Sequence, residues 1–181
     1  MTAYVSLFRG INVGGHHAVK MTDLKALHES LGLQHISTYI QSGNVVFHSD
    51  DIDPAHLCKQ IESSFEERFG FHAEVLVRTL DELDAIIEKT PFLAHDSKEP
   101  KWIAVVFLAT APDEAAQTAL LQTYVGPEEI HILGKEMYIY YSEGMGRSKL
   151  TNNLIEKKLK TIGTTRNWNT VLQLQKMLQP L

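Results

Sequence analysis

The residues best suited to chemistry near the start of the chain form a glycine-rich segment that directly follows an apolar stretch. Arg9, Asn12, Gly14 and Gly15 lie close together there, with Gly10 between the first two. Glycine lets backbone amides approach a ligand closely, and arginine supplies a positive charge, so the segment predicts a loop that binds a small anionic or polar ligand. It has neither the Gly-x-Gly-x-x-Gly spacing of dinucleotide-binding loops nor the Lys-Ser/Thr ending of a P-loop. A tight connection that needs glycine only for its backbone angles is the alternative.

A second polar turn joins two β-rich segments further along the chain. It consists of Gln41, Ser42, Gly43 and Asn44. Ser42-Gly43 has the two-residue length of a tight hairpin, which accounts for this pair without a ligand. Gln41 and Asn44 either cap the turn or hydrogen-bond a ligand held by the glycine loop. We therefore include Gln41, Ser42 and Asn44 among the candidate ligand-binding residues.

Two basic segments near the C-terminus also precede predicted helices. Arg147 and Lys149 flank Ser148, and the free amides at the start of a helix favour a nearby anion. The alternative is that Ser148 is a plain helix cap. Arg166 stands just before the last predicted helix, and we expect its neighbour Trp168 in the core rather than stacked on a nucleic-acid base. Arg147, Lys149 and Arg166 complete the candidate ligand-binding set.

The sequence assigns no catalytic residue, and enzymatic activity is left open. The nine histidines form no His-Glu-x-x-His or paired-cysteine pattern, so we expect no metal site and no cofactor. His16 and His17 in the glycine loop could exchange protons at neutral pH, or they form a solvated pair. The one cysteine, Cys58, falls on the apolar side of a predicted helix, where we expect a small core residue.

The composition is that of an ordinary globular protein, with 181 residues, 44% hydrophobic and 22% charged. No stretch approaches the roughly 20 apolar residues of a membrane span, and the N-terminus has no secretory pattern. A single cysteine cannot form an internal disulfide, which agrees with a reducing compartment. We therefore expect a cytoplasmic location and no membrane partner.

Charge is distributed unevenly along the chain. Residues 1–144 hold 10 Lys+Arg against 21 Asp+Glu, whereas residues 145–181 hold 7 against Glu156 alone. A basic segment of this kind can contact phosphates, which makes nucleic acid a partner to consider. The acidic surroundings weaken the long-range attraction that such binding needs. The alternative is that the segment docks on the protein's own acidic surface.

Hydrophobic periodicity predicts an order of elements that occurs twice. The first set is a strand at 3–8, a helix ending at Gly32, strands at 35–41 and 44–48, a helix from Asp53-Pro54 to Gly70, and a strand at 72–78. A linking helix at 80–89 follows. The second set is a strand at 102–109, a helix from Pro112, strands at 129–133 and 137–142, and a helix at 148–160. The second set then continues directly into a C-terminal helix.

The repeated βαββαβ order predicts an α+β fold of two duplicated ferredoxin-like units with antiparallel sheets and a C-terminal helical extension. We expect the first unit at 1–79, a linking helix and loop at 80–100, and the second unit with its C-terminal helix at 101–181. Right-handed crossover makes the first two strands of each unit parallel. The glycine loop should therefore lie beside the turn at 41–44, which makes this edge of the first unit the preferred functional face.

Four ordered blocks of the sequence carry a family resemblance. They lie at 8–15, 38–47, 148–152 and 165–171, and so span nearly the whole chain. Together they resemble a widespread bacterial family known as a domain of unknown function, DUF1697. The resemblance implies a duplicated ferredoxin-like α/β fold. It implies no activity, cofactor or site residue.

Three functional classes follow from these observations. We favour binding of a small anionic or polar ligand at the glycine-loop edge of the first unit, with or without a reaction. A protein-interaction module without catalysis is the second class, and its partner is unknown. Nucleic-acid binding through the basic C-terminal segment or an exposed sheet face is the third, which rests on analogy with other proteins of this fold.

Overall fold

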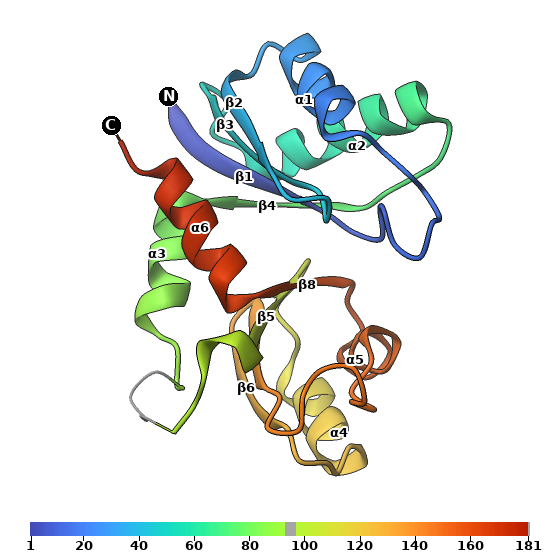
Figure 1. Ribbon diagram of the computed structural model, residues 1–181, viewed down its shortest axis with the longest axis vertical. Coiled ribbons are helices and arrows are strands. Elements are labelled where there is room, and N and C mark those ends of the chain that lie inside the picture. The colour runs from blue at the N-terminus through green and yellow to red at the C-terminus, as the bar shows by residue number, and fades with distance from the viewer. Residues whose placement is uncertain (93–96, 181) are drawn as a thin grey trace. The chain divides into compact units, whose positions relative to one another are not determined.

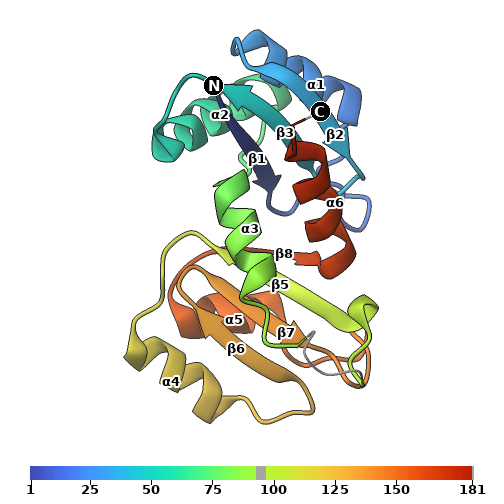
Figure 2. The same ribbon diagram turned by 90° about the vertical axis from the view of Figure 1, so that its left-hand side faces the viewer.

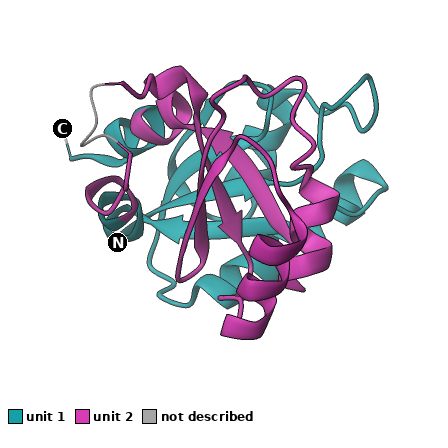
Figure 3. Cartoon of the chain, turned by 90° about the horizontal axis from the view of Figure 1, so that it is seen from below, with its two compact units in different colours: residues 1–85, 173–181 teal, residues 86–172 magenta. Residues whose placement is uncertain are grey.

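The computed structural model describes residues 1–92 and 97–180, which form an α+β fold with six α-helices and two four-stranded sheets (Figure 1). The chain divides into two compact units, Met1–Ala85 with Gln173–Leu181, and Ile86–Leu172 (Figure 3). The division differs from the boundaries predicted from the sequence because two helices cross it. These are α3 (Leu80–Glu88) and α6 (Trp168–Leu178).

The sheet of the first unit has the strand order β2-β3-β1-β4, with every neighbouring pair antiparallel. Its strands are β1 (Thr2–Phe8), β2 (Gln34–Tyr39), β3 (Asn44–Ser49) and β4 (Val75–Thr79). Because β3 runs antiparallel to both β1 and β2, these two strands are parallel and end at the same edge. The segments that follow β1 and β2 therefore meet there, as the sequence predicts.

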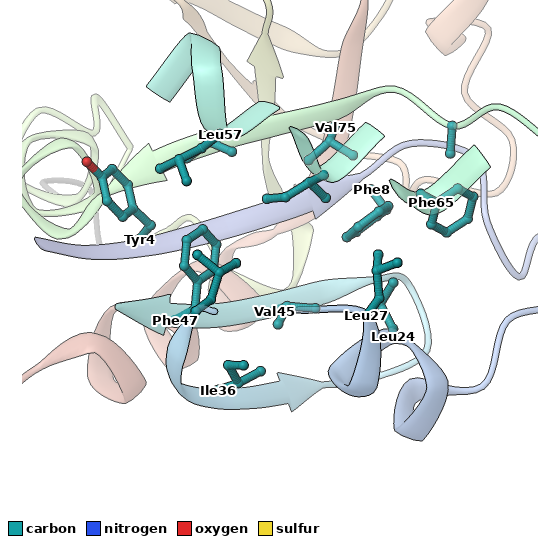
Figure 4. Close-up of a cluster of buried hydrophobic side chains, with 14 of the residues drawn as sticks. Tyr4, Phe8, Leu24, Leu27, Ile36, Val45, Phe47, Leu57, Phe65 and Val75 are labelled. Atoms are coloured by element: carbon teal, nitrogen blue, oxygen red, sulfur yellow. The ribbon is translucent and has the colours of Figure 1, made fainter. Parts of the chain in front are cut away.

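The core of the first unit lies between one face of this sheet and two helices, α1 (Met21–Ser30) and α2 (Pro54–Phe69). Alternate residues of β1 and β3 point into it, and Figure 4 shows Tyr4, Phe8, Val45 and Phe47 facing the helices. As predicted, α2 begins at the Asp53 cap, whose carboxylate accepts from the amide of Ala55, and ends at Gly70 in the left-handed region.

The second sheet repeats the strand order as β6-β7-β5-β8, again antiparallel throughout. Its strands are β5 (Ile103–Leu108), β6 (Glu129–Leu133), β7 (Glu136–Tyr140) and β8 (Gly163–Asn167), preceded by a short 3-10 helix, η1 (Pro100–Trp102). Figures 1 and 2 show α4 (Glu114–Thr123) and α5 (Asn152–Leu159) on one face, where they enclose a second apolar core.

Strand β8 was not predicted from the sequence because it is polar. Thr164 and Arg166 are 4% and 7% exposed, so hydrogen bonding rather than apolar character lets these side chains be buried. Gly163 also fits only as glycine, since a Cβ there would lie 2.9 Å from Val106 Cγ1. With β8, the second sheet has four strands like the first. The sequence prediction had lacked a strand at the end of the second unit, and β8 is that strand.

Two other predicted boundaries were wrong. The turn between β2 and β3 has four residues, 40–43, instead of the two-residue hairpin that Ser42-Gly43 predicts. Helix α5 begins at Asn152 instead of at 148, because the hydroxyl of Thr151 caps it by accepting from the amide of Leu154 at 3.3 Å. The segment containing Arg147 and Lys149 is therefore an irregular loop and not a helix start.

Each sheet is followed at once by a helix. The hydroxyl of Thr79 accepts from the amide of Glu82, and the carboxylate of Glu82 accepts from the amide of Thr79, both at 3.1 Å, so the pair caps α3 reciprocally. At α6, Asn167 Oδ1 accepts from the amide of Thr170 at 2.8 Å. Trp168 is fully buried, as predicted. Within the described part of the chain, no helix is both long and apolar enough to cross a membrane.

Candidate functional site

The glycine loop and the β2–β3 turn meet through the side chain of Asn12. Its Nδ2 donates to the carbonyl of Gln41 at 2.7 Å and to that of Val19 at 3.0 Å, and its Oδ1 accepts from the amide of Val19 at 2.7 Å. A further backbone bond joins Phe8 N to Gly43 O at 2.9 Å. Asn12 therefore fastens both ends of the loop to the turn, and its hydrogen-bonding groups are used within the protein.

The glycines of the loop form the tip of a small hairpin. The amide of Asn12 donates to the carbonyl of His17, and the amide of His16 donates to that of Val13. Gly14 and Gly15, at the tip, have φ values of 58° and 77°, the positive angles that a tight hairpin turn needs at both central positions. Both are exposed and a Cβ at either would meet nothing. Backbone geometry therefore accounts for these two glycines.

Hydrogen bonds and close packing hold the β2–β3 turn in its shape. Asn44 is buried, and its Nδ2 donates at 3.0 Å to both the carbonyl of Tyr39 and the hydroxyl of Ser42. Gly43 has φ 88°, and a Cβ there would lie 2.6 Å from Ile11 Cδ1. Ile40 also has a positive φ, 49°, although a β-branched residue is strained in this region. Asn44 and Ser42 thus support the turn, whereas Gln41 is exposed on it.

A cavity of about 640 Å³ opens beside this fastened edge. It is lined by Asn12, Ala18, Val19, Lys20, Met21, Thr22, Asp23, Gln41 and Phe69. Of the predicted residues, Asn12 and Gln41 lie in its wall. We call it the loop-edge cavity.

The start of α1 faces this cavity without a cap. Lys20 occupies the capping position, and no side chain there accepts a hydrogen bond from the first turn. Among the described residues, the amides of Met21 and Thr22 have no hydrogen-bond acceptor. Unpaired amides at a helix start carry partial positive charge and favour an anion. Lys20 and Thr22 are not among the residues predicted from the sequence, which placed the candidate anion-binding amides in the glycine loop.

Arg9 does not line the loop-edge cavity. Its guanidinium forms an ion pair with the carboxylate of Glu74, with 3.4 Å between Arg9 Nη1 and Glu74 Oε2. The two side chains are 30% and 33% exposed. His17, the loop histidine considered as an acid or base, stacks on Phe71 with ring centroids 4.4 Å apart. Neither side chain therefore points to chemistry in the cavity.

The other predicted residues lie in the second unit. Arg147 and Lys149 are exposed and line a separate cavity of about 470 Å³. Arg166 lines neither cavity. Its guanidinium donates to Thr164 Oγ1 at 2.8 Å and to the carbonyl of Thr165 at 3.0 Å, and burial lowers its pKa to about 10. These neighbours account for Arg166 without a ligand.

One buried polar pair was missed by sequence reasoning. His28 Nδ1 donates to the carbonyl of Leu24 at 2.8 Å, which leaves Nε2 to accept from the hydroxyl of Ser6 at 2.9 Å. Both residues are fully buried, and burial lowers the pKa of His28 to about 4. The one signal was the place of His28 on the apolar side of α1, four residues after Leu24. Because no solvent reaches the pair, it is part of the core.

No described group of three or more His, Cys, Asp or Glu side chains could hold a metal ion. Among the described residues, Lys157, Lys158 and Lys160 form no ion pair within 4.0 Å.

Comparison with known proteins finds a family model and solved structures that match this chain. The structure of a conserved bacterial protein from Streptococcus pneumoniae is 26% identical in sequence, with a TM-score of 0.73, over 98% of this chain and 99% of that chain. No curated protein matches the sequence. The family model described as "Protein of unknown function (DUF1697)" matches residues 1–138. The chain therefore belongs to the DUF1697 family.

Proposed function

We propose that the loop-edge cavity binds a small molecule through a phosphate or carboxylate group. The observation that carries this proposal is that the uncapped start of α1 opens onto the cavity with Lys20 beside it. The amides of Met21 and Thr22, the hydroxyl of Thr22 and the ammonium group of Lys20 are all hydrogen-bond donors. An anionic group is the ligand chemistry that satisfies all of them.

The remaining wall of the cavity supports a ligand with more than an anionic group. Val19, Met21 and Phe69 provide an apolar surface, and the carboxylate of Asp23 and the side-chain amide of Gln41 are exposed on the rim. Asp23 repels a bare anion, so the ligand should also carry a hydroxyl or amino group that donates to it. This selects organic phosphates and hydroxy or amino acids over inorganic anions.

The strain at Ile40 also supports a functional role for this edge. A β-branched residue at φ 49° costs on the order of 1–3 kcal/mol, and 46% of Ile40 is exposed, so burial gives little in return. The turn keeps this shape because Asn12, Asn44 and Phe8 bond to its backbone. Such strain persists at binding sites, where it presents a side chain to a ligand.

Thermal shift with nucleotides, sugar phosphates and organic acids tests this function. We expect at least one compound to stabilise the protein, by about 2.7 kcal/mol at a hundredfold excess over its Kd. Lys20→Gln should raise that Kd about tenfold. Lys25→Gln, an exposed lysine of the same helix that does not line the cavity, is the matched control and should leave the Kd unchanged. Arg9→Gln should also leave it unchanged, because Arg9 pairs with Glu74.

Two outcomes would contradict the proposal. One is that no compound of these classes stabilises the wild-type protein. The other is that Lys20→Gln binds an identified compound as tightly as Lys25→Gln does. The second result would indicate that the compound binds at another part of the surface.

A protein partner is the second candidate function. Val13, in the glycine loop, is 63% exposed and Ile40, in the neighbouring turn, is 46% exposed, so two apolar side chains are presented at the same edge. Binding of a partner that covers them should be lost in the Val13→Ser variant, as measured by co-purification.

Nucleic-acid binding on the first sheet has less support. The residues of β1 and β3 that face away from α1 and α2 are buried, namely Val5, Leu7 and Val46.

The repeated topology supports a duplicated ferredoxin-like origin for the two units. Both sheets have the same strand order. Val5 pairs with Arg78 in the first sheet and Val105 pairs with Arg166 in the second, and each arginine stands just before the capping residue of the next helix. A shared register at this level is expected of two copies of one unit.

A further inference from the structure

The second unit contains a cavity that the proposed function does not use. It has a volume of about 470 Å³ and lies between the segments 124–128 and 143–149. We call it the Glu128 cavity, after the carboxylate in its wall. Both segments are irregular, and a side-chain hydrogen bond joins them.

A hydrogen-bond network centred on Glu128 joins the two segments. Tyr124 and Ser148 donate their hydroxyl groups to the two carboxylate oxygens, Ser148 at 2.5 Å to Oε1, and Ser148 Oγ also accepts from the amide of Leu150 at 3.1 Å. A side chain at Gly126 would collide with Tyr124 Oη and with Glu128 Oε2. The cavity wall is therefore built around a carboxylate whose position is fixed.

Glu128 is charged and Tyr124 is neutral at physiological pH. Burial raises the pKa of Glu128, but the hydrogen bonds from Ser148 and Tyr124 outweigh it, so that the pKa lies below its usual value. Burial and the neighbouring carboxylate raise the pKa of Tyr124 to about 12. The tyrosine therefore stays a donor, and Glu128 keeps its negative charge with further lone pairs available to a ligand.

Cations and carboxylates line this cavity without neutralising one another. Arg147 and Lys149 are exposed there, as is Glu143, and among the described residues none of these three has an ion-pair partner within 4.0 Å. Together with Glu128 they give two positive and two negative groups in one wall. Unpaired charges of both signs in one wall are complementary to a small molecule that carries charges of both signs on separate groups.

We propose that the Glu128 cavity is a second binding site, for a small zwitterion whose phosphate or carboxylate group pairs with Arg147 and Lys149 and whose ammonium group pairs with Glu128. Val125, which is 90% exposed at the rim, contacts the carbon chain between the two charged groups. This site lies wholly within the second unit and does not depend on the loop-edge cavity.

Titration followed by amide NMR tests this site with defined probes. Phosphoethanolamine and γ-aminobutyrate carry an ammonium group together with an anionic group, whereas phosphate, butyrate and ethanolamine carry charge of one sign only. We expect the two zwitterions to cause saturable shifts at Gly126, Gly144 and Arg147, with Kd values at least about tenfold below those of the single-charge probes. Equal affinity for a zwitterion and its single-charge fragments, or no saturable shift in the millimolar range, would overturn the proposal.

Matched variants separate the two ends of the site. Arg147→Gln should raise the Kd of both zwitterions about tenfold, whereas Lys157→Gln, an exposed lysine outside the cavity, should not. Glu128→Gln should weaken the zwitterions but leave phosphate binding unchanged or tighter, because it removes a negative charge. If Glu128→Gln disturbs the fold by circular dichroism, Glu143→Gln makes the comparison instead, since it removes the other carboxylate of the cavity wall from an exposed side chain and should weaken the zwitterions in the same direction. Weakening of phosphate and zwitterion alike by a well-folded acidic-site variant would refute the role of the carboxylates.

Discussion

Each sheet has a corresponding backbone hydrogen bond at the edge where β1 or β5 ends, but the loops and turns at that edge differ between the two units. Phe8 N donates to the carbonyl of Gly43 in the first unit, and Leu108 N donates to the carbonyl of Lys135 in the second, at 2.9 and 2.8 Å. In the first unit a four-residue turn under a fastened glycine loop forms one wall of the loop-edge cavity. In the second, the two-residue turn Gly134-Lys135 lies between β6 and β7.

The shared strand order and hydrogen bond are therefore not enough to form a cavity like the loop-edge cavity, because the connecting loops also differ. The connection from β1 to α1 runs from 9 to 20, whereas that from β5 to α4 runs only from 109 to 113. The longer connection adds the hairpin at Asn12 and leaves α1 without a cap. The shorter one ends in Asp113, whose carboxylate accepts from the amide of Ala116 at 2.7 Å and so caps α4. Of these two connections, the longer one leaves its helix start uncapped and the shorter one does not.

The largest effect should come from filling the space under the first turn. Gly43→Ala places a methyl group 2.6 Å from Ile11 Cδ1 and 2.9 Å from Phe8 Cβ at φ 88°, so we expect a loss of about 3 kcal/mol in unfolding free energy. Gly134→Ala, at φ 61° with its nearest neighbour 4.0 Å away, should cost only about 1 kcal/mol. Urea denaturation measures both. Equal losses would show that the first turn is no more tightly packed than the second.

The cores of the two units differ in a second way, at corresponding strand positions. Ser6 follows the residue of β1 that pairs with Arg78, and Val106 follows the residue of β5 that pairs with Arg166. Ser6 bonds to His28, whereas Val106 lies among the apolar side chains of the second core. A buried, neutral histidine makes the stability of the first unit depend on pH.

The sign of this dependence follows from the lowered pKa. His28 has a pKa of about 4 in the folded protein against 6.5 for an ordinary histidine, so the unfolded chain takes up a proton between these values that the folded protein does not. Stability is therefore complete above pH 6.5 and falls as the pH drops towards 4. Between pH 7 and pH 5 we expect a loss of about 2 kcal/mol.

A double variant isolates this contribution. Ser6→Val with His28→Leu replaces both partners by apolar groups and should remove about 2 kcal/mol of the pH dependence. His48, whose pKa burial and His35 also lower, contributes with the same sign and remains in the variant. Denaturant unfolding at pH 5, 6 and 7 makes the comparison. An unchanged pH slope in the variant would show that His28 is not the group that titrates.

Sequence periodicity predicted most of the fold because most elements bury an apolar side. It failed at β8, where Thr164 and Arg166 are buried by hydrogen bonding, a tertiary property that no local pattern contains. It also predicted that the glycine loop and the turn at 41–44 would meet, since parallel strands end at one edge. The sequence left open whether Asn44 caps the turn or meets a ligand, and it gave no bonding role to Asn12, because both side chains bond to backbone groups that only the folded turn brings within reach.

The smallest expected effect tests whether the strained turn serves binding. Ile40→Asn relieves the positive φ of 49°, since asparagine tolerates the left-handed region, and should stabilise the protein by about 1 kcal/mol. Leu133→Asn is the control at the other turn, because Leu133 is 45% exposed but does not have a positive φ, and it should bring no gain. Thermal unfolding measures both, and a compound that stabilises the wild type should bind Ile40→Asn more weakly. A variant that is more stable and binds equally well would mean that the strain at Ile40 has no part in recognition, and would leave the start of α1 as the whole of the loop-edge site.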